Sequence, residues 1–318
     1  MSVFTSRLTA SPAAKLGAYG VLLVGLLGGG AVVGAAVGPD PSTPAHDAAH
    51  DTAAPVTAAS PLPAGLAVSE DGYQLQLATS TVAAERPAEL RFVIAGPDGA
   101  PVTEFDVAHD KELHFIIVSR DLATFAHLHP ERDTAGTWTV TAPALPAGSY
   151  RVYADFVPTG HDGMTLAADL AVPGDYTPRP VPDPTDEVTV EGYDVAFDGQ
   201  LVAGEESELT VTVTRGREPV TDLDPYLGAL GHLVAIRDGD LAYLHVHPLD
   251  DLDGPGGPAV RFAVDVPTAG TYGLYFDFSH GDTVRTAAVT VTASAAHPTD
   301  GATSQSAGSG DDHDTHEG

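Results

Sequence analysis

The chain has 318 residues, which is enough for two ordinary domains with appendages. Its 44 acidic residues outweigh 14 basic ones and give a formal net charge of −30, which disfavours a nucleic-acid partner because phosphate backbones would be repelled. The absence of cysteine excludes disulfides, thiolate metal sites, thiol nucleophiles and a lipid anchor on a cysteine.

The N-terminal segment predicts export from the cytoplasm. Arg7 and Lys15 precede residues 16–38, which contain no charged residue. This segment is long enough to span a bilayer, and its basic flank, residues 1–15, is expected to stay in the cytoplasm. We therefore predict a single-pass transmembrane anchor in the cell membrane, with the bulk of the chain extracytoplasmic. The alternative is a signal peptide cleaved near residues 34–36, which would release the remainder as a secreted protein.

Low-complexity segments divide the rest of the chain. Residues 39–64 and 294–318 are rich in small, polar and acidic residues, and their apolar content is too low to offset the entropy of ordering. We predict a disordered stalk and a disordered acidic, histidine-containing tail. Residues 175–186 are proline-rich and predict a semi-rigid linker. Two stretches that resemble each other remain, residues 65–174 and 187–293.

These two stretches are predicted to be a tandem duplication of one β-sandwich. Their apolar runs are short, rich in β-branched and aromatic residues, and bounded by Gly, Pro and Asp, with no convincing helical period. The pattern predicts an all-β fold of two antiparallel β-sandwiches, immunoglobulin-like or cupredoxin-like, after the N-terminal transmembrane helix. The recurring motifs are Gly72-Tyr73 with Gly192-Tyr193, Pro101-Val102-Thr103 with Pro219-Val220-Thr221, and Ala147-Gly148-Ser149-Tyr150 with Ala269-Gly270-Thr271-Tyr272. Strands in the first repeat are expected at residues 89–95, 113–119, 137–141 and 150–156.

Histidines recur at matching positions in the two repeats. Residues 101–130 and 219–248 align without a gap at an offset of 118, and eight of these thirty positions are identical. Three of the eight are histidine, which is an uncommon residue, so the coincidence is informative. The matching pairs are His114 with His232, His127 with His245, and His129 with His247.

Hairpin geometry predicts that these rings meet. Asp238-Gly239 suits a two-residue type I′ turn, which would place His232 directly opposite His245. A turn at Arg120-Asp121 would place His114 directly opposite His127. Opposed residues share a face with Cβ atoms about 4.5–5.5 Å apart, and a residue two positions along the strand shares that face. We therefore predict one cluster of three imidazoles in each repeat, close enough to bind one metal ion.

Two further pairs are predicted to complete the sites. Asp155 and Asp277 interrupt largely apolar strands, where a carboxylate needs a partner such as an imidazole N–H. We expect them to orient the metal-binding rings. His161 and His280 match after a difference in loop length and are predicted as a fourth ligand in each repeat. His109 has no counterpart and is expected to be incidental.

The residue types favour copper(II) or zinc as the bound ion, because imidazole sites with a carboxylate suit both. A blue-copper centre would need a cysteine, and Met1 and Met164 are too few for a thioether-rich copper(I) site. No nucleophile motif such as Gly-x-Ser-x-Gly is present, so we expect no enzymatic activity, although three-histidine metal catalysis or pH sensing stays open. The main alternative is a polar network between the two sheets of each sandwich, because the histidine face also carries Ile116 and Val118.

The repeats resemble known families of exported bacterial proteins. Residues 101–156 and 219–278, with their His-x-His-Pro segments, are similar to YtkA-like and CopC-like envelope modules, which are often associated with copper or other heavy metals. The resemblance implies an extracytoplasmic protein that handles copper or another heavy metal. Together with the N-terminal anchor this predicts a membrane-anchored metal-binding protein, and an envelope protein partner stays open. The competing prediction is a structural or protein-interaction module without metal.

Overall fold

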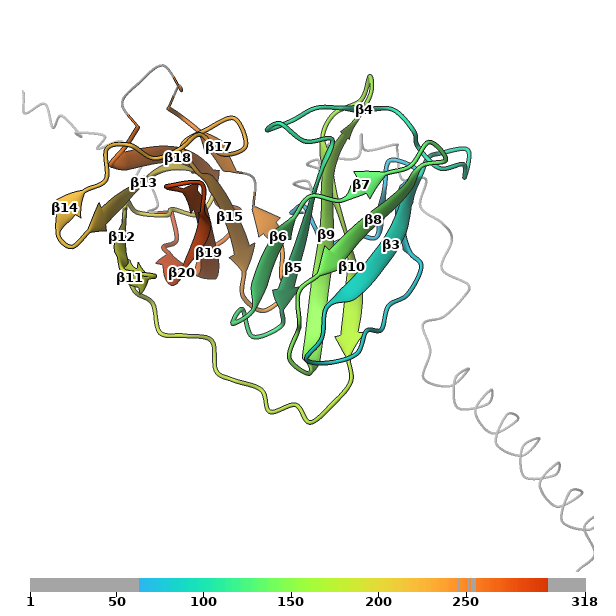
Figure 1. Ribbon diagram of the computed structural model, residues 1–318, viewed down its shortest axis with the longest axis horizontal. Coiled ribbons are helices and arrows are strands. Elements are labelled where there is room, and N and C mark those ends of the chain that lie inside the picture. The colour runs from blue at the N-terminus through green and yellow to red at the C-terminus, as the bar shows by residue number, and fades with distance from the viewer. Residues whose placement is uncertain (1–62, 245, 251, 253–255, 297–318) are drawn as a thin grey trace, which may run out of the picture. The chain divides into compact units, whose positions relative to one another are not determined.

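The computed structural model describes residues 63–244, 246–250, 252 and 256–296 (Figure 1). These residues belong to one compact unit, Pro61–Gly318. The predicted anchor at residues 16–38, nearly all of the predicted stalk, His245 and most of the tail lie outside the described residues. Among the described residues, no helix is long and apolar enough to cross a membrane.

The first repeat folds into two antiparallel sheets. One has the strand order β1-β2-β3-β8-β7 and the other β10-β9-β5-β6, with β4 pairing to β9. The strands are β1 (Ser69–Glu70), β2 (Tyr73–Leu77), β3 (Ala88–Ala95), β4 (Phe105–Asp106), β5 (Leu113–Ser119), β6 (Phe125–Leu128), β7 (Glu131–Arg132), β8 (Thr137–Ala142), β9 (Gly148–Pro158) and β10 (Met164–Val172).

The second repeat has the same architecture. Its sheets have the orders β11-β12-β13-β18-β17, with β14 pairing to β13, and β16-β15-β19-β20. The strands are β11 (Glu187–Val190), β12 (Tyr193–Asp198), β13 (Glu206–Arg215), β14 (Glu218–Pro219), β15 (His232–Arg237), β16 (Tyr243–Leu244), β17 (Val246–Pro248), β18 (Ala259–Asp265), β19 (Gly270–Ser279) and β20 (Val284–Ala293). The predicted all-β fold of two antiparallel sandwiches is therefore confirmed.

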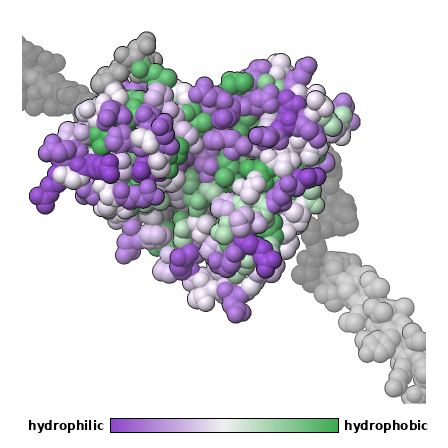
Figure 2. Space-filling view, in the orientation of Figure 1, coloured by the Kyte–Doolittle hydropathy of each residue, from purple (hydrophilic) through white to green (hydrophobic). Residues whose placement is uncertain are grey.

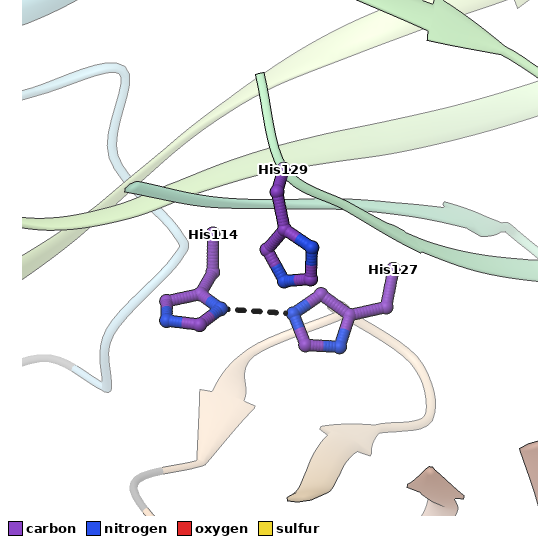
Figure 3. Close-up of side chains that lie close together, drawn as sticks. All are labelled: His114, His127 and His129. Carbon is purple, nitrogen blue, oxygen red and sulfur yellow. Dashed lines mark hydrogen bonds between the residues drawn. The ribbon is translucent and has the colours of Figure 1, made fainter. Parts of the chain in front are cut away.

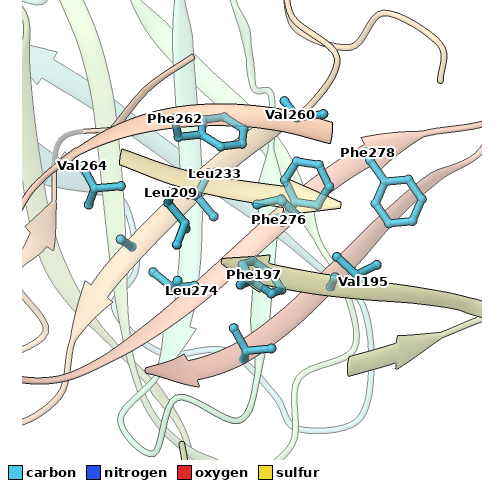
Figure 4. Packing of buried hydrophobic residues seen from close by; sticks show 14 of the residues in the cluster. Val195, Phe197, Leu209, Leu233, Val260, Phe262, Val264, Leu274, Phe276 and Phe278 are labelled. Atoms are coloured by element: carbon cyan, nitrogen blue, oxygen red, sulfur yellow. The ribbon is translucent and has the colours of Figure 1, made fainter. Parts of the chain in front are cut away.

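Alternating burial explains why these segments form sandwiches. In β2 and β12 every second residue is buried, as expected for strands with one face on a core and one on solvent. The second core is rich in aromatic residues, and Phe262, Phe276 and Phe278 pack together there (Figure 4). Hydrophilic side chains cover much of the visible surface, as the acidic composition requires (Figure 2).

Strand β5 is buried on both faces, because the second repeat covers the face that points away from its own sandwich. Phe115 and Ile117 lie in the core of the first repeat. Ile116 and Val118 lie instead in a third apolar cluster, which contains residues of both repeats. The histidine face of β5 therefore does not lie between the two sheets of one sandwich, as the alternative interpretation assumed. The members of the third apolar cluster are Ile116, Val118, Leu122, Tyr153 and Ala167 of the first repeat and Val234, Ile236, Leu241, Tyr243 and Tyr275 of the second.

Reciprocal contacts make this interface nearly symmetric. The Tyr153 hydroxyl donates to the Leu241 carbonyl at 2.6 Å, and the Tyr275 hydroxyl donates to the Leu122 carbonyl at 2.8 Å. The Phe125 ring also stacks on Tyr275 with centroids 4.0 Å apart. The two repeats therefore present similar surfaces to each other, in the manner of an isologous dimer built within one chain.

Both hairpins that carry the histidines have longer turns than predicted. Val118 pairs with Phe125 in the first repeat, which leaves a four-residue loop at residues 120–123. The second hairpin has the corresponding loop at residues 238–241. The predicted two-residue turns at Arg120-Asp121 and Asp238-Gly239 are wrong.

Burial in the interface explains the longer loops. Each loop turns on a leucine with positive φ, 57° at Leu122 and 61° at Leu241, and both side chains are buried against the other repeat. The register differs from the prediction by two residues, so His127 pairs with Ile116 instead of His114. A shift of two positions preserves the face on which a side chain lies, and the histidines of the first hairpin still share one face.

Candidate metal centre

Three histidines of the first repeat converge at the interface. His114 lies on β5, His127 on β6, and His129 immediately after β6. The ring centroids are 5.2 Å apart for His114 and His127, 5.2 Å for His114 and His129, and 4.8 Å for His127 and His129. One potential ligand atom from each ring lies within 4.8 Å of the others. Figure 3 shows the three rings pointing toward one another.

Hydrogen bonds to groups outside the three-histidine cluster fix the tautomers of two of these rings. His114 Nε2 lies 3.1 Å from the Ala108 carbonyl oxygen, and His127 Nδ1 lies 2.8 Å from Asp277 Oδ2. A carbonyl and an ionised carboxylate only accept hydrogen bonds, so both of these ring nitrogens must donate. In the neutral rings, His114 Nδ1 and His127 Nε2 are then left with lone pairs.

These two nitrogens face each other at 3.0 Å. Two lone pairs at this distance repel unless a cation lies against them. A second proton on His127, stabilised by Asp277, is one way to supply the positive charge. That proton leaves two buried nitrogens, His129 Nε2 and His232 Nδ1, without a hydrogen-bond partner among the described residues. Buried nitrogens of this kind are usually paired with a protein group, an ordered water or an ion.

Burial keeps most of the cluster neutral. It lowers the pKa of His114 to about 3 and that of His129 to about 4, with the neighbouring His127 ring acting in the same direction. Burial also holds the pKa of His232 well below its usual value, again with a smaller contribution from His127. Neutral imidazole is the form that binds metal ions, so these rings are ready to ligate at neutral pH.

Described residues of the second repeat contribute to this same cluster of potential ligands. His232 begins β15, and its ring lies 4.7 Å from that of His127 and 5.3 Å from that of His114. His127, His232 and Asp277 form a second group of potential ligands within 4.8 Å. His247 is exposed on β17, which pairs with β18 in the opposite sheet. The prediction of one separate cluster per repeat therefore differs from the structure, which joins histidines of both repeats.

The two predicted aspartates lie beside the cluster in the strand register. Asp155 pairs with His114 across β9 and β5, and Asp277 pairs with His232 across β19 and β15. Asp277 bonds an imidazole as predicted, but the imidazole belongs to His127 of the other repeat. The Asp155 carboxylate accepts a hydrogen bond from Thr165 Oγ1 at 2.9 Å.

The predicted fourth ligands lie elsewhere. The His161 ring packs edge-on against Tyr73, with centroids 5.5 Å apart. The matching His280 accepts a hydrogen bond from the Tyr193 hydroxyl at Nδ1, 2.8 Å away, and pairs through Nε2 with Asp222 at 3.2 Å. Among the described residues, neither histidine belongs to a group of potential metal ligands. The structure therefore does not bring the two predicted fourth ligands to the cluster of His114, His127 and His129.

His109 was expected to be incidental, but its ring borders the cluster. The ring lies 6.0 Å from that of His114 and 5.7 Å from that of His232. A tight turn with positive φ at both His109 and Asp110 holds it there, closed by hydrogen bonds between Ala108 and Lys111. The same turn presents the Ala108 carbonyl to His114. No repeated motif signals this turn, so the alignment of the two halves could not find it.

The geometry suits a transition-metal ion. Metal–nitrogen bonds of about 2.0 Å place two ligand atoms about 2.8 Å apart at a right angle and about 3.3 Å apart at a tetrahedral angle. The 3.0 Å between His114 Nδ1 and His127 Nε2 lies within this range. The carboxylate behind His127 is the usual orienting partner of a metal-binding histidine. Imidazole ligands suit copper(II) and zinc(II).

Comparison of the sequence with protein families identifies the repeat. The model of a domain of unknown function, DUF8832, matches twice, over residues 67–174 and 188–295, which together exceed half of the 318 residues. The chain belongs to the DUF8832 family. The resemblance of this DUF8832 protein to YtkA-like and CopC-like modules stays a prediction, because the family that matches is a different one. No curated protein sequence matches the chain.

Solved structures of other proteins are similar to parts of the DUF8832 chain. The Escherichia coli adhesin FdeC aligns with 14% identity and a TM-score of 0.25, covering 73% of this chain and 66% of FdeC. InvD of Yersinia pseudotuberculosis aligns with 14% identity and a TM-score of 0.24, covering 72% and 59%. The chain thus spans less than two thirds of either structure. At these TM-scores the likenesses carry no argument about function.

Proposed function

We propose that this DUF8832 protein is a membrane-anchored, extracytoplasmic protein that binds a divalent transition-metal ion, copper(II) or zinc(II). The ligands would include His114, His127 and His129. Asp277 would orient the ring of His127 and stabilise the positive charge of the ion. The proposed role is binding of the ion, without an enzymatic reaction. Asp277 is buried and accepts two hydrogen bonds, which holds its carboxylate against His127.

One observation carries this proposal. The outer bonds to Ala108 and Asp277 leave His114 Nδ1 and His127 Nε2 with lone pairs that face each other at 3.0 Å. A structural network of neutral rings would place a donor opposite each acceptor. An ion between the rings satisfies both lone pairs and also the unpaired nitrogen of His129.

Metal titration tests the proposal. Calorimetry with copper(II) and with zinc(II), and elemental analysis of the purified full chain, should show stoichiometric binding. Replacing His127 and His129 together by alanine should abolish it. The matched control replaces His161 and His280, which removes the same number of histidines away from the cluster and should leave binding intact. Unchanged binding in the first variant would refute the site. No metal in the wild type, with a lowered melting temperature in the first variant, would favour the structural network.

The proposed location rests on residues 16–38 and their basic flank. A reporter enzyme that is active only outside the cytoplasm, fused after the second repeat, should be active and should fractionate with membranes. Activity in the medium alone would indicate a cleaved signal. An inactive reporter would contradict export.

A further inference from the structure

The strongest polar contact of the cluster joins the two repeats. His127 of the first repeat donates to Asp277 of the second at 2.8 Å, and each side chain is only 2% exposed. The His232 ring of the second repeat lies nearly parallel to that of His114, at an angle of 14°. The site therefore takes its present form only while the two repeats are docked.

The surrounding interface holds these residues in place. Next to the histidines, Ile116 and Val118 of the first repeat pack with Val234 and Ile236 of the second. Further along, Arg151 Nη1 donates to the Asp240 carbonyl at 3.2 Å, and Arg120 donates to the Gly239 carbonyl. Apolar packing and hairpin contacts dock the sheets, and the histidines occupy one end of the same interface.

Among the described residues, the second repeat has no group of three histidines like that of the first. In the first repeat the chain also crosses to the opposite sheet, but only from Glu131 in β7, so His129 still lies beside His114 and His127. In the second repeat, the chain leaves β16 for β17, which pairs with the opposite sheet and exposes His247. His232 is left at the interface with a buried nitrogen that has no partner among the described residues.

We propose that a single metal centre is shared by the two repeats, with His114, His127 and His129 from the first and His232 from the second as ligands of the same ion. The inference rests on the proposed metal-binding function and adds what the ion does. The ion stabilises the association of the two repeats, so the repeats act as one metal-dependent unit and not as two independent metal carriers.

Thermodynamic linkage turns this into a measurable effect. If an ion binds ligands of both repeats, association of the repeats increases the affinity for the ion by some factor. By thermodynamic linkage, the ion then increases the affinity of the repeats for each other by the same factor. Such coupling typically amounts to about 5–150-fold. An ion whose affinity does not depend on any residue of the other repeat would give a factor of one.

Cutting the linker makes the association measurable. A protease recognition sequence inserted within residues 175–186, which contain no strand or helix, allows the full chain to be cut between the repeats while both remain present. The dissociation constant of the cut halves is then measured by analytical ultracentrifugation, with chelator and with saturating zinc(II) or copper(II). Where the halves bind too tightly, exchange between two populations of cut protein with different dyes gives the dissociation rate.

We expect the ion to tighten the association at least tenfold in the wild type. The His232→Ala variant should still bind an ion through the first repeat, more weakly, and should keep only the part of the tightening that Asp277 of the second repeat provides through His127. The His280→Ala control, which removes a histidine of the second repeat outside the cluster, should keep all of it. An ion that binds but leaves the dissociation constant unchanged would overturn the inference. So would two ions per chain, each retained when the histidines of the other repeat are replaced. Absence of binding to the uncut chain would overturn the proposed function itself.

Discussion

Replacing Asp277 by asparagine tests the electrostatics of the centre with almost no change in shape. The Asp277 carboxylate is 1% exposed and accepts hydrogen bonds from His127 Nδ1 at 2.8 Å and from Thr286 Oγ1 at 2.5 Å. The amide of asparagine can still accept one bond through its oxygen, but it carries no charge. His127 then becomes a weaker ligand, because nothing stabilises the positive charge it shares with the ion.

Loss of such an orienting carboxylate typically reduces metal affinity about 10–100-fold. This corresponds to about 1.4–2.8 kcal/mol of binding free energy. We expect the Asp277→Asn variant to raise the dissociation constant for zinc(II) or copper(II) by this factor, measured by competition with a chromophoric chelator at neutral pH. The stoichiometry should stay the same, because all the histidines remain.

Asp194→Asn is the matched control. Asp194 also accepts a threonine hydroxyl, from Thr189 at 2.7 Å, but lies on β12 away from the histidines. Its replacement should leave the metal affinity unchanged. An Asp277→Asn variant that is folded and binds the ion as tightly as the wild type would refute the role of Asp277. Equal losses in both variants would show that net charge, and not the bond to His127, sets the affinity.

Two further predictions concern the metal-free protein. Because burial lowers the pKa of His114 from 6.5 to about 3, the unfolded state takes up protons first as the pH falls, and stability is lost below about pH 6.5. Between pH 8 and pH 5 this residue should account for about 2 kcal/mol of the loss in unfolding free energy. Urea unfolding of His114→Asn should therefore show a pH dependence smaller by that amount than the wild type. A pH dependence equal to that of the wild type would contradict the buried neutral ring. Tyr153→Phe and Tyr275→Phe should each lower the unfolding free energy by about 1–3 kcal/mol, because each leaves a leucine carbonyl of the buried interface without its donor. Similar losses in the two variants would support the near symmetry of the interface, and no loss in either would mean that water replaces the hydroxyl.

The duplication and the sandwich fold could be predicted because they depend on local pattern. Strand-length apolar runs between Gly, Pro and Asp leave few alternatives to an antiparallel sandwich. The shared face of the first-repeat histidines was also predictable, even though the hairpin register was not. Strand periodicity is two, so a register error of two residues changes the partner of His127 but not the side of the sheet on which it lies.

The register itself depended on tertiary packing. Asp238-Gly239 favours a two-residue turn by its local chemistry. The observed loop buries Leu241 against the other repeat and places its carbonyl under the Tyr153 hydroxyl. Burial of a leucine side chain contributes about 1.5–3 kcal/mol, which exceeds the preference for one turn type. A single hairpin sequence cannot reveal this, because the surface that buries the leucine comes from the other half of the chain.

The shared centre was missed for a related reason. Alignment of the two halves compares equivalent positions and suggests equivalent sites. It contains no information on contacts between non-equivalent positions, such as His127 with Asp277. One signal was present in the sequence: residues 115–118 are all apolar, which is typical of a strand buried on both faces. A sheet in a two-sheet sandwich buries only one face in the core. A second apolar face therefore indicates that another domain or element packs against it.

Duplication explains how such a centre can arise. Two identical domains with a histidine-bearing apolar face can bury that face against each other, and the reciprocal bonds of Tyr153 and Tyr275 are those that such a symmetric pairing would form. A symmetric interface would place matching histidines around a two-fold axis, as His114 and His232 still are, with their rings stacked at 14°. A single ion has few coordination positions, so the two repeats can contribute unequal numbers of ligands to it. His129 lies in the cluster, whereas its counterpart His247 is exposed on β17. In the proposed centre the first repeat would therefore supply most of the ligands, and the second would supply His232 and the carboxylate. An ion bound in this way ties the stability of the interface to metal supply, which neither domain could achieve alone.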